Sequence, residues 1–373
     1  MLQIILRPQI HKFSSCVDFA SNFHLGAQDL ILTNRYIYEP YFGKLNLECM
    51  TIFQEDYGTG EPTDVMAEQI ISDVFKLGKF CRIIAIGGGT VIDLAKAIAV
   101  CPKGKDLDQL YCNPSKLQKY YDLVLVPTTC GTGSEMTNVA VFNRVKLDTK
   151  MGLVSDSMYA DHAVLVPELL NTLPYHVFAT SSIDALVHAV ESCLSPRATS
   201  YSKIFGYNAI ESILHGYQAL VKYGFEYRSK LMENFLVASN YAGISFGTAG
   251  CAAVHAMAYP LGGMYHISHG ESNYVCFTHV LRAYMNIKRD GEMAVLNEQL
   301  SNILQCDKGI VYDSLDELLK KILPKKTLRE YGVTQDDLKP FADNVVKTQQ
   351  RLMTNAFTPL SFYQILKIYQ DLY

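Results

Sequence analysis

The sequence predicts an α/β domain over residues 1–164, built on a Rossmann-like parallel sheet, and an all-α domain over residues 165–373. In the first half, apolar strand-like runs alternate with helical periodicity, which is typical of a parallel sheet covered by helices on both faces. Near residue 165 the pattern changes to one helix after another. The length of 373 residues also favours two domains, and a hydrophobic content of 49% provides enough material for their cores.

The elements of the first domain are predicted from apolar runs and their flanking residues. In chain order we expect a strand in MLQIIL, a helix in SSCVDFASNFH, strands in DLILTN and MTIFQ, a helix in TDVMAEQIISDVFKLGK, a strand, glycine turn and helix in RIIAIGGGTVIDLAKAIAV, and a strand in DLVLVP. Thr63 is the expected cap of the second helix, because a threonine hydroxyl can accept a hydrogen bond from a free backbone N–H of the first turn.

The second domain is predicted to be helical throughout. The expected helices lie in SSIDALVHAVES, ATSYSKIFGYNAIESILHGYQALVKYG, YRSKLMENFLVASNYAGISF, YDSLDELLKKIL, TQDDLKPFADNVVKTQQRLMTNAF and SFYQILKIYQDLY. No internal repeat and no low-complexity linker separates the two halves, so we expect the two domains to pack tightly.

Charge and composition exclude several classes of partner. Lys and Arg number 33 against 37 Asp and Glu, a net charge of −4, which argues against nucleic acid or an anionic membrane as the main partner. Residues 234–270 contain no Asp, Glu, Lys or Arg, as a membrane span would, but they hold six Gly, Pro260 and three His. We therefore interpret this charge-free segment as a buried helix pair.

The ten cysteines form no Cys-x-x-Cys pair, and most lie in apolar runs. In a chain of this length they are typical of reduced thiols, so we expect a cytoplasmic protein without a disulfide framework. The start, MLQIILRPQIHKF, has neither a basic leader nor a small-residue cleavage site, and we expect no signal peptide.

Two glycine-containing turns follow predicted strands. Gly87, Gly88 and Gly89 come after RIIAI and open a helix, where backbone N–H groups can approach a phosphate. The usual G-x-G-x-x-G fingerprint is not met, because Ile92 takes its sixth position, and a turn that serves packing alone is the alternative. The second turn, residues 127–134, reads PTTCGTGS after another apolar strand. Together the two turns predict a nucleotide-binding domain, since ligands bind at the carboxyl ends of such strands.

Histidines and one aspartate gather in two helical segments of the second half. Asp184 and His188 are spaced i, i+4 and share a helix face, and both could reach one divalent ion or simply hydrogen-bond each other in a core. The charge-free segment adds His255, His266 and His269. The sequence thus predicts a site of one carboxylate and three imidazoles, formed by the side chains of Asp184, His188, His255 and His269.

Four motifs occur together in an order and spacing that resemble the iron-dependent (group III) alcohol dehydrogenases: GGGTVIDLAKAIA, PTTCGTGSEMTN, SSIDALVHAVESCLS and VHAMAYPLGGMYHISHG. The resemblance covers nearly the whole chain. Further segments, DYGTGEPTD, NYAGISFGTAG, HGESNY, LREYGV and QQRLMTNAF, look like those of the 4-hydroxybutyrate dehydrogenases within that family. The resemblance implies a dehydroquinate synthase-like fold: an N-terminal dinucleotide-binding domain and a C-terminal helical domain, with a metal in the cleft between them.

The resemblance also implies roles for individual residues. The metal ligands of the family fall on Asp184, His188, His255 and His269. Its cofactor-binding positions fall on Asn34, Gly87, Gly88, Gly89, Asp93, Thr128, Thr129, Thr137 and Lys150.

Two departures from the family pattern bear on mechanism. Many members carry an acid at the position of Asn34, which excludes the 2′-phosphate of NADP, and Arg35 could instead pair with that phosphate. Many members carry a second histidine where Tyr259 stands, as a proton relay. We expect Tyr259 and His266 to be the catalytic residues, with His266 as donor to a substrate carboxylate or as part of a relay. The alternative is that His266 only stabilises the backbone turn before His269.

The sequence therefore predicts an NAD-dependent dehydrogenase that interconverts 4-hydroxybutyrate and succinate semialdehyde, with Fe²⁺ or Zn²⁺ as a Lewis acid. The alternatives are a dehydrogenase of the same family acting on another alcohol, such as butanol or 1,3-propanediol, a lyase of the dehydroquinate synthase type, and a non-catalytic nucleotide-binding protein. We expect a small-molecule substrate, no nucleic-acid or membrane partner, and a homodimer.

Overall fold

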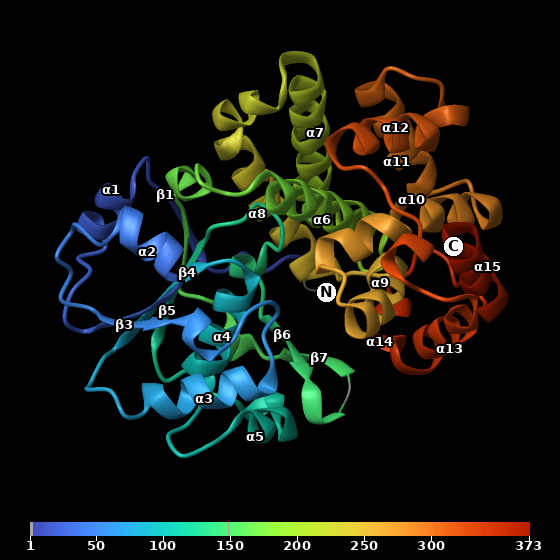
Figure 1. Cartoon of the computed structure of the whole chain (residues 1–373). Coiled ribbons are helices and arrows are strands. Elements are labelled where there is room, and N and C mark those ends of the chain that lie inside the picture. Colours follow the sequence, from blue (N-terminus) through green and yellow to red (C-terminus); the bar gives the residue numbers. More distant parts are fainter. Residues whose placement is uncertain (1–2, 148) are drawn as a thin grey trace. The chain divides into compact units, whose positions relative to one another are not determined.

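The computed structural model describes residues 3–147 and 149–373, which form two compact units. One unit spans Leu6–Leu173, and the other contains Pro174–Tyr373 with the short segment before Leu6. The first holds a sheet and its helices, and the second is helical (Figure 1). The expected boundary at residues 164 and 165 lies at the end of the last strand of the sheet, His162–Leu165, and the division by contacts falls later, after Leu173.

The first unit is built on a six-stranded sheet in the order β1-β8-β5-β4-β2-β3, and every neighbouring pair is parallel, as predicted. The strands are β1 (Gln9–Lys12), β2 (Asp29–Thr33), β3 (Met50–Phe53), β4 (Arg82–Gly87), β5 (Asp122–Pro127) and β8 (His162–Leu165). All five residues of β2 are buried, because helices cover both faces of a parallel sheet.

The strand expected in MLQIIL is wrong for the residues that the structure describes, since residues 3–6 are not in a strand and residues 1–2 lie outside the description. The first strand is Gln9–Lys12, directly after Pro8. Proline has no N–H to donate to a ladder, so pairing begins beyond it, with Gln9 opposite His162.

The helices of the first unit are α1 (Cys16–Asn22), α2 (Arg35–Tyr41), α3 (Asp64–Val74), α4 (Gly89–Val100) and α5 (Leu107–Cys112). Thr63 caps α3 as predicted, because its hydroxyl accepts a hydrogen bond from the backbone N–H of Met66. An antiparallel hairpin, β6 (Val139–Arg144) and β7 (Thr149–Val154), was not predicted.

The second unit contains α6 (Tyr175–Leu194), α7 (Ser200–Tyr223), α8 (Met232–Ala249), α9 (Ala253–Tyr265), α10 (His269–Ile287), α11 (Glu292–Leu304), α12 (Val311–Ile322), α13 (Leu338–Thr348), α14 (Gln350–Met353) and α15 (Phe362–Leu372). The charge-free segment forms most of α8, all of α9 and the start of α10, so the predicted buried helix pair is confirmed. Among the described residues one helix, α6, is long and apolar enough to cross a membrane, and 89% of its apolar window is buried inside the protein. Helix α6 is therefore a core helix of this unit.

Candidate functional site

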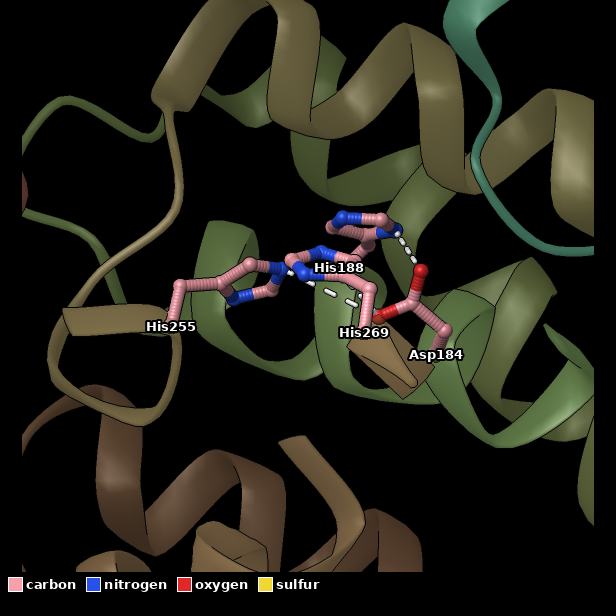
Figure 2. A group of neighbouring side chains, drawn as sticks. All are labelled: Asp184, His188, His255 and His269. Atoms are coloured by element: carbon pink, nitrogen blue, oxygen red, sulfur yellow. Dashed lines mark ion pairs between the residues drawn. The ribbon is translucent and has the colours of Figure 1, made fainter. Parts of the chain in front are cut away.

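Three helices of the second unit bring Asp184, His188, His255 and His269 together (Figure 2). Asp184 and His188 project from the same face of α6, one turn apart. His255 lies in the first turn of α9, and His269 is the first residue of α10. One ligand atom from each of the four residues lies within 4.8 Å of the others. Residues far apart in sequence thus offer one oxygen and three nitrogens to a common point.

The carboxylate of Asp184 is the centre of this group. Its oxygens lie 3.9 Å from His188 Nδ1, 3.9 Å from His255 Nε2 and 3.8 Å from His269 Nε2, beyond direct hydrogen bonding. Three of the four side chains are buried, whereas a third of the His269 side chain is exposed. A divalent cation fits between donors at this separation, and one carboxylate with three imidazoles is a donor set that suits Fe²⁺ and Zn²⁺ alike.

The electrostatics of the group favour an ionised Asp184. Burial raises the pKa of this carboxyl, but His188, His269, His255 and a hydrogen bond from Asn273 outweigh burial and hold the pKa below its ordinary value. A buried anion surrounded by imidazoles is a suitable environment for a cation, because the carboxylate already carries the charge that the cation would neutralise.

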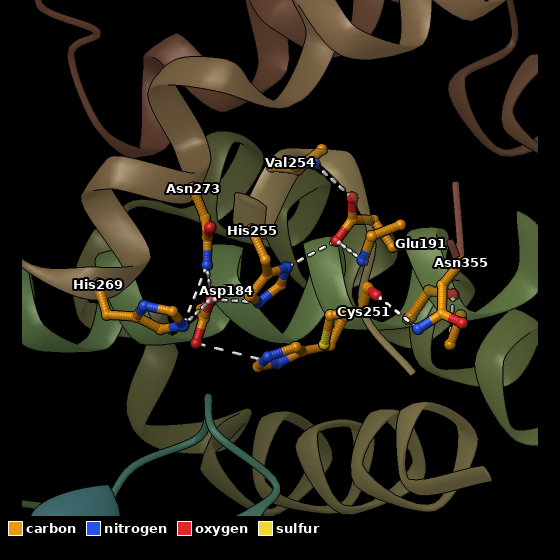
Figure 3. Close-up of polar contacts among 12 residues, drawn as sticks. Asp184, Glu191, Cys251, Val254, His255, His269, Asn273 and Asn355 are labelled. Carbon is orange, nitrogen blue, oxygen red and sulfur yellow. Dashed lines mark hydrogen bonds and ion pairs between the residues drawn. The ribbon is translucent and has the colours of Figure 1, made fainter. Parts of the chain in front are cut away.

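A buried glutamate orients one of the imidazoles. Glu191 accepts hydrogen bonds from the backbone N–H of Ala252 at 3.0 Å and of Val254 at 2.6 Å, and it lies 2.6 Å from His255 Nδ1 (Figure 3). Because an ionised carboxylate only accepts, His255 Nδ1 carries a proton, which leaves Nε2 as the nitrogen that could present a lone pair to a cation. His255 Nε2 is buried and has no hydrogen-bond partner in the described structure. An orphaned imidazole nitrogen aimed at Asp184 is what a metal ligand requires.

Sequence reasoning missed Glu191 and Asn273. Asn273 Nδ2 donates to Asp184 Oδ1 at 2.7 Å, and Asn273 follows His269 by one turn of α10. Both could have been found from spacing, since Glu191 lies seven residues after Asp184 on the same face of α6.

The two residues predicted to be catalytic lie at different places. The ring of Tyr259, in α9, is partly buried, with its centroid 6.3 Å from that of His269. His266 is exposed and ends α9 in a left-handed backbone conformation, with φ of 54°. His266 is not among the four residues whose ligand atoms meet, whereas the ring of Tyr259 is a neighbour of one of them, His269.

The glycine turns lie at the carboxyl edge of the sheet in the first unit. Gly87 pairs with Pro127 where β4 and β5 end, and the N–H of Thr128 donates to the carbonyl of Gly87 at 3.1 Å. Gly88 precedes α4 without a side-chain cap, which leaves backbone N–H groups of the first turn for a ligand. A Cβ at Gly88 would lie 3.4 Å from Thr129, and one at Gly89 would lie 3.0 Å from Thr132. The two glycines therefore let the second turn lie close against the first, beside backbone N–H groups of the kind that bind a pyrophosphate.

Gly87 serves packing as well. A Cβ there would lie 2.5 Å from the side chain of Val91 in the first turn of α4. The absence of a side chain at this position therefore allows the helix to begin directly at the end of the strand.

Asp93 and Thr137 belong to a buried network that joins the two turns. The carboxylate of Asp93 accepts hydrogen bonds from Ser134 Oγ at 2.7 Å and from the N–H of Val141 at 2.9 Å, and burial raises its pKa. Lys96 Nζ donates to Ser134 at 2.8 Å and to Thr137 at 3.0 Å, and burial lowers the pKa of this lysine to about 8. These contacts hold the second turn against α4.

The two remaining predicted residues, Asn34 and Lys150, come from elements other than the two turns. Asn34 follows β2 and precedes α2, where its side chain is buried and donates to Gln54 and Glu55. Lys150, in β7, forms an ion pair with Glu61 at 2.5 Å, and little of its side chain is exposed.

Comparison with known families gives matches over nearly the whole chain. Residues 15–167 match the family described as iron-containing alcohol dehydrogenase, and residues 178–373 match the C-terminal region of the Fe-containing alcohol dehydrogenase family. The chain is 46% identical over 368 residues to a 4-hydroxybutyrate dehydrogenase of Clostridium kluyveri, which covers 99% of each chain. It is 33% identical over 366 residues to long-chain-alcohol dehydrogenase 1 of Geobacillus thermodenitrificans, covering 93% of this chain and 90% of that one.

Solved structures share the fold at lower sequence identity. A sulfoacetaldehyde reductase from Bifidobacterium kashiwanohense, solved in complex with NAD+, superimposes with a TM-score of 0.86 at 20% identity, over 100% of this chain and 99% of that chain. A 1,3-propanediol oxidoreductase gives a TM-score of 0.83 at 21% identity over the full length of both chains. The arrangement of a parallel-sheet unit and a helical unit is therefore common to this chain and to these enzymes.

Proposed function

The chain belongs to the iron-containing alcohol dehydrogenase family, and from that premise we propose that it interconverts 4-hydroxybutyrate and succinate semialdehyde with NAD(H). The observation that carries the proposal is the group of Asp184, His188, His255 and His269, in which the buried His255 Nε2 has no hydrogen-bond partner among the residues that the structure describes. The choice of substrate is supported by the identity of 46% to a 4-hydroxybutyrate dehydrogenase over 99% of the chain.

When bound, a divalent cation would supply Lewis-acid polarisation of the substrate oxygen, and NAD(H) would supply the hydride acceptor or donor. The protein supplies position and charge. Asp184, His188, His255 and His269 hold the cation, and Glu191 fixes the tautomer of His255. Gly88 and Gly89 leave room for the pyrophosphate at the start of α4, as the dinucleotide-binding turns of other enzymes do.

Further residues are proposed to contact the cofactor. Asn34 would accept or donate a hydrogen bond at the adenosine ribose, and Thr128 and Thr129 line the second turn next to Gly88. Asp93 and Thr137 act through the buried network that shapes this turn, and Lys150 contributes a cation on β7.

The proton and the substrate carboxylate are assigned to Tyr259 and His266. Tyr259 is proposed as a proton donor because its ring lies beside His269. His266 is exposed and could donate to a carboxylate or take part in a relay, and the charge-free segment around it provides no Lys or Arg for that purpose. We also expect the enzyme to be cytoplasmic and to form a homodimer.

The proposal is tested by turnover with a panel of alcohols, followed by the absorbance of the reduced coenzyme. We expect the highest kcat/KM for 4-hydroxybutyrate, with butanol and 1,3-propanediol well below it. A preference for a plain alcohol or diol would keep the family chemistry and reject the substrate. Absence of any dehydrogenase activity, in protein loaded with Fe²⁺ or Zn²⁺, would favour a lyase of the dehydroquinate synthase type or a non-catalytic nucleotide-binding protein.

The same assay separates the roles of His266. If His266 donates to the substrate carboxylate, His266→Ala lowers kcat/KM for 4-hydroxybutyrate by roughly 1.5–3 kcal/mol and leaves butanol unchanged. If it relays protons, both substrates slow together and the pH profile shifts. Unchanged kinetics with both substrates would limit His266 to ending α9.

A further inference from the structure

An acidic side chain lies beside the uncharged Asn34 at the carboxyl end of β2. Asn34 Nδ2 donates to Glu55 Oε2 at 2.9 Å, and the backbone N–H of Arg35 donates to Glu55 Oε1 at 2.6 Å. Glu55 comes from the 3₁₀ turn Gln54–Tyr57, which follows the neighbouring strand β3. Two hydrogen bonds thus hold the carboxylate of Glu55, which follows β3, against Asn34 and Arg35, which follow β2. About a quarter of the Glu55 side chain, 27%, stays exposed.

The basic side chain at this strand end is already engaged. Arg35 makes two hydrogen bonds to Asp56, with Nη1 2.5 Å from Oδ1 and Nη2 2.8 Å from Oδ2. Its guanidinium also lies over the ring of Phe53, 4.3 Å from the ring centroid. A paired, stacked arginine presents neither its charge nor its donor fork to a further anion, because both are already used.

We propose that Glu55 selects against the 2′-phosphate of NADP at the end of β2, and that Asp56 withholds Arg35 from that phosphate. The inference rests on the proposed function, since it assumes a dinucleotide bound at Gly87–Gly89. Strand β4, which leads into the glycine turn, lies next to β2 in the sheet, with Leu32 opposite Ala85, so the same edge carries both features. In dinucleotide-binding folds a carboxylate at this edge accepts from a ribose hydroxyl and repels a phosphate, whereas a free arginine accommodates the phosphate.

The charges at this strand end favour a coenzyme without a 2′-phosphate. A 2′-phosphate replaces a hydroxyl near Asn34 and would bring up to two negative charges next to Glu55 and Asp56, while the neighbouring Arg35 is already paired. Like charges at such short separations repel each other strongly enough near a protein surface that removing one carboxylate should change the relative affinity for the two coenzymes roughly tenfold. A ribose hydroxyl meets no such repulsion, and it can donate to the same carboxylate.

The test is the dissociation constant of NADH and of NADPH, measured by coenzyme fluorescence, which needs no turnover. In the wild-type protein we expect NADPH to bind at least about tenfold more weakly than NADH. Glu55→Gln should narrow this ratio roughly tenfold by strengthening NADPH binding, and adding Asp56→Asn, which releases Arg35, should narrow it further. Glu48→Gln is the matched control, because the exposed Glu48 lies before β3, at the opposite end of that strand.

The outcomes separate the inference from the proposed function. Suppose that the wild-type protein binds NADH, but that in Glu55→Gln and in the double variant the ratio of the NADPH and NADH dissociation constants stays within about twofold of the wild-type ratio. Other residues then select the coenzyme, and the inference is wrong. Equal binding of both coenzymes to the wild-type protein likewise rejects it while leaving the dehydrogenase assignment intact. If the wild-type protein binds neither coenzyme, the proposed function itself fails. Equal thermal unfolding of all variants verifies that the fold is retained.

Discussion

At the scale of single residues, the geometry of the candidate metal site depends on the side chains that orient the ligands as well as on the ligands themselves. His255 can offer a lone pair from Nε2 because Glu191 fixes the proton on Nδ1, and Glu191 is itself fixed by two backbone N–H groups that open α9. The carboxylate of Asp184 is oriented in a similar way, because Asn273 donates a hydrogen bond to its Oδ1. The donor atoms are therefore held apart at the right separation before a cation arrives, which lowers the cost of organising the site.

We expect Glu191→Gln to lower metal affinity by about 10- to 100-fold while the protein stays folded, because a neutral amide can no longer accept from all three donors. Competition with a chelator measures the affinity, and metal content after dialysis provides a second readout. Glu211→Gln, at an exposed position of α7, should leave both unchanged. Wild-type affinity in Glu191→Gln would mean that the tautomer of His255 is fixed in another way.

His279, on α10, predicts an acid-side loss of stability. Burial and the nearby charge of Lys325 lower its pKa from 6.5 to about 4, and its Nδ1 is buried without a hydrogen-bond partner in the described structure. The unfolded chain therefore binds a proton more readily than the folded protein between pH 6.5 and 4, so stability falls as the pH falls through that range. The expected contribution is roughly 2 kcal/mol between about pH 7 and pH 4.5.

The measurement is the free energy of unfolding as a function of pH for the wild-type protein and for His279→Phe. Other carboxyl groups titrate in the same range in both proteins, so the difference between the two curves isolates His279. The variant should lose less stability toward low pH. Two parallel curves would show that His279 is protonated equally in the folded and unfolded states.

At the scale of elements, close contact between α6 and α10 positions the ligands. A Cβ at Gly270, next to His269, would lie 2.3 Å from the backbone carbonyl oxygen of Thr180 and 3.2 Å from the Cβ of Asp184. Because backbone atoms cannot move aside easily, a side chain here would push α10 away from α6 and separate His269 from Asp184.

Gly270→Ala should therefore destabilise the protein by about 1–3 kcal/mol, the usual cost of overpacking, and should weaken metal binding as well. Thermal unfolding and chelator competition report the two effects. The matched control is Gly263→Ala in α9, where nothing lies within 4 Å of an added Cβ. If Gly270→Ala binds metal like the control, the approach of α10 to α6 does not set the ligand geometry.

The elements also show where sequence reasoning succeeds. Strands β2, β4 and β5 and helix α3 were predicted because their apolar runs and the cap at Thr63 are strong local signals. The hairpin of β6 and β7 was missed, since its strands pair with each other outside the main sheet and only alternate residues of β6 are buried, which gives no continuous apolar run. The first strand was misplaced because its register depends on pairing with β8, more than 150 residues away in the chain.

The candidate site divides in the same way. The four residues that meet in the second unit could be predicted from helical spacing and from the absence of charge around His255 and His269. The supporting contacts of Glu191 and the pairing of Arg35 with Asp56 depend on tertiary geometry, which no local pattern encodes. His266 shows that a sequence pattern can also suggest too much, because its place in a histidine-rich segment does not reveal that its side chain is exposed.

At the scale of the whole molecule, the two kinds of site belong to different units. The four clustered ligand residues all come from Pro174–Tyr373, and the glycine turns come from Leu6–Leu173. Each site is built on the core of its own unit. Helix α6, which carries Asp184 and His188, is buried along most of its length. Strands β4 and β5, which lead into the glycine turns, are buried as well. Binding of the metal and of the coenzyme should therefore stabilise different parts of the chain.

Removing the metal should then destabilise one unit and spare coenzyme binding by the other. A ligand that binds only the folded state stabilises it by about 4 kcal/mol at a thousandfold excess over its dissociation constant, so the chelated protein should lose protection from hydrogen exchange in α6, α9 and α10. Addition of NADH to the chelated protein should still protect residues 87–94 and 128–137, which form the two turns and their surroundings. His255→Ala should behave like the chelated wild-type protein, because it lacks one ligand while the turns are untouched. Loss of the NADH-dependent protection in both samples would show instead that the coenzyme turns depend on the metal for their structure.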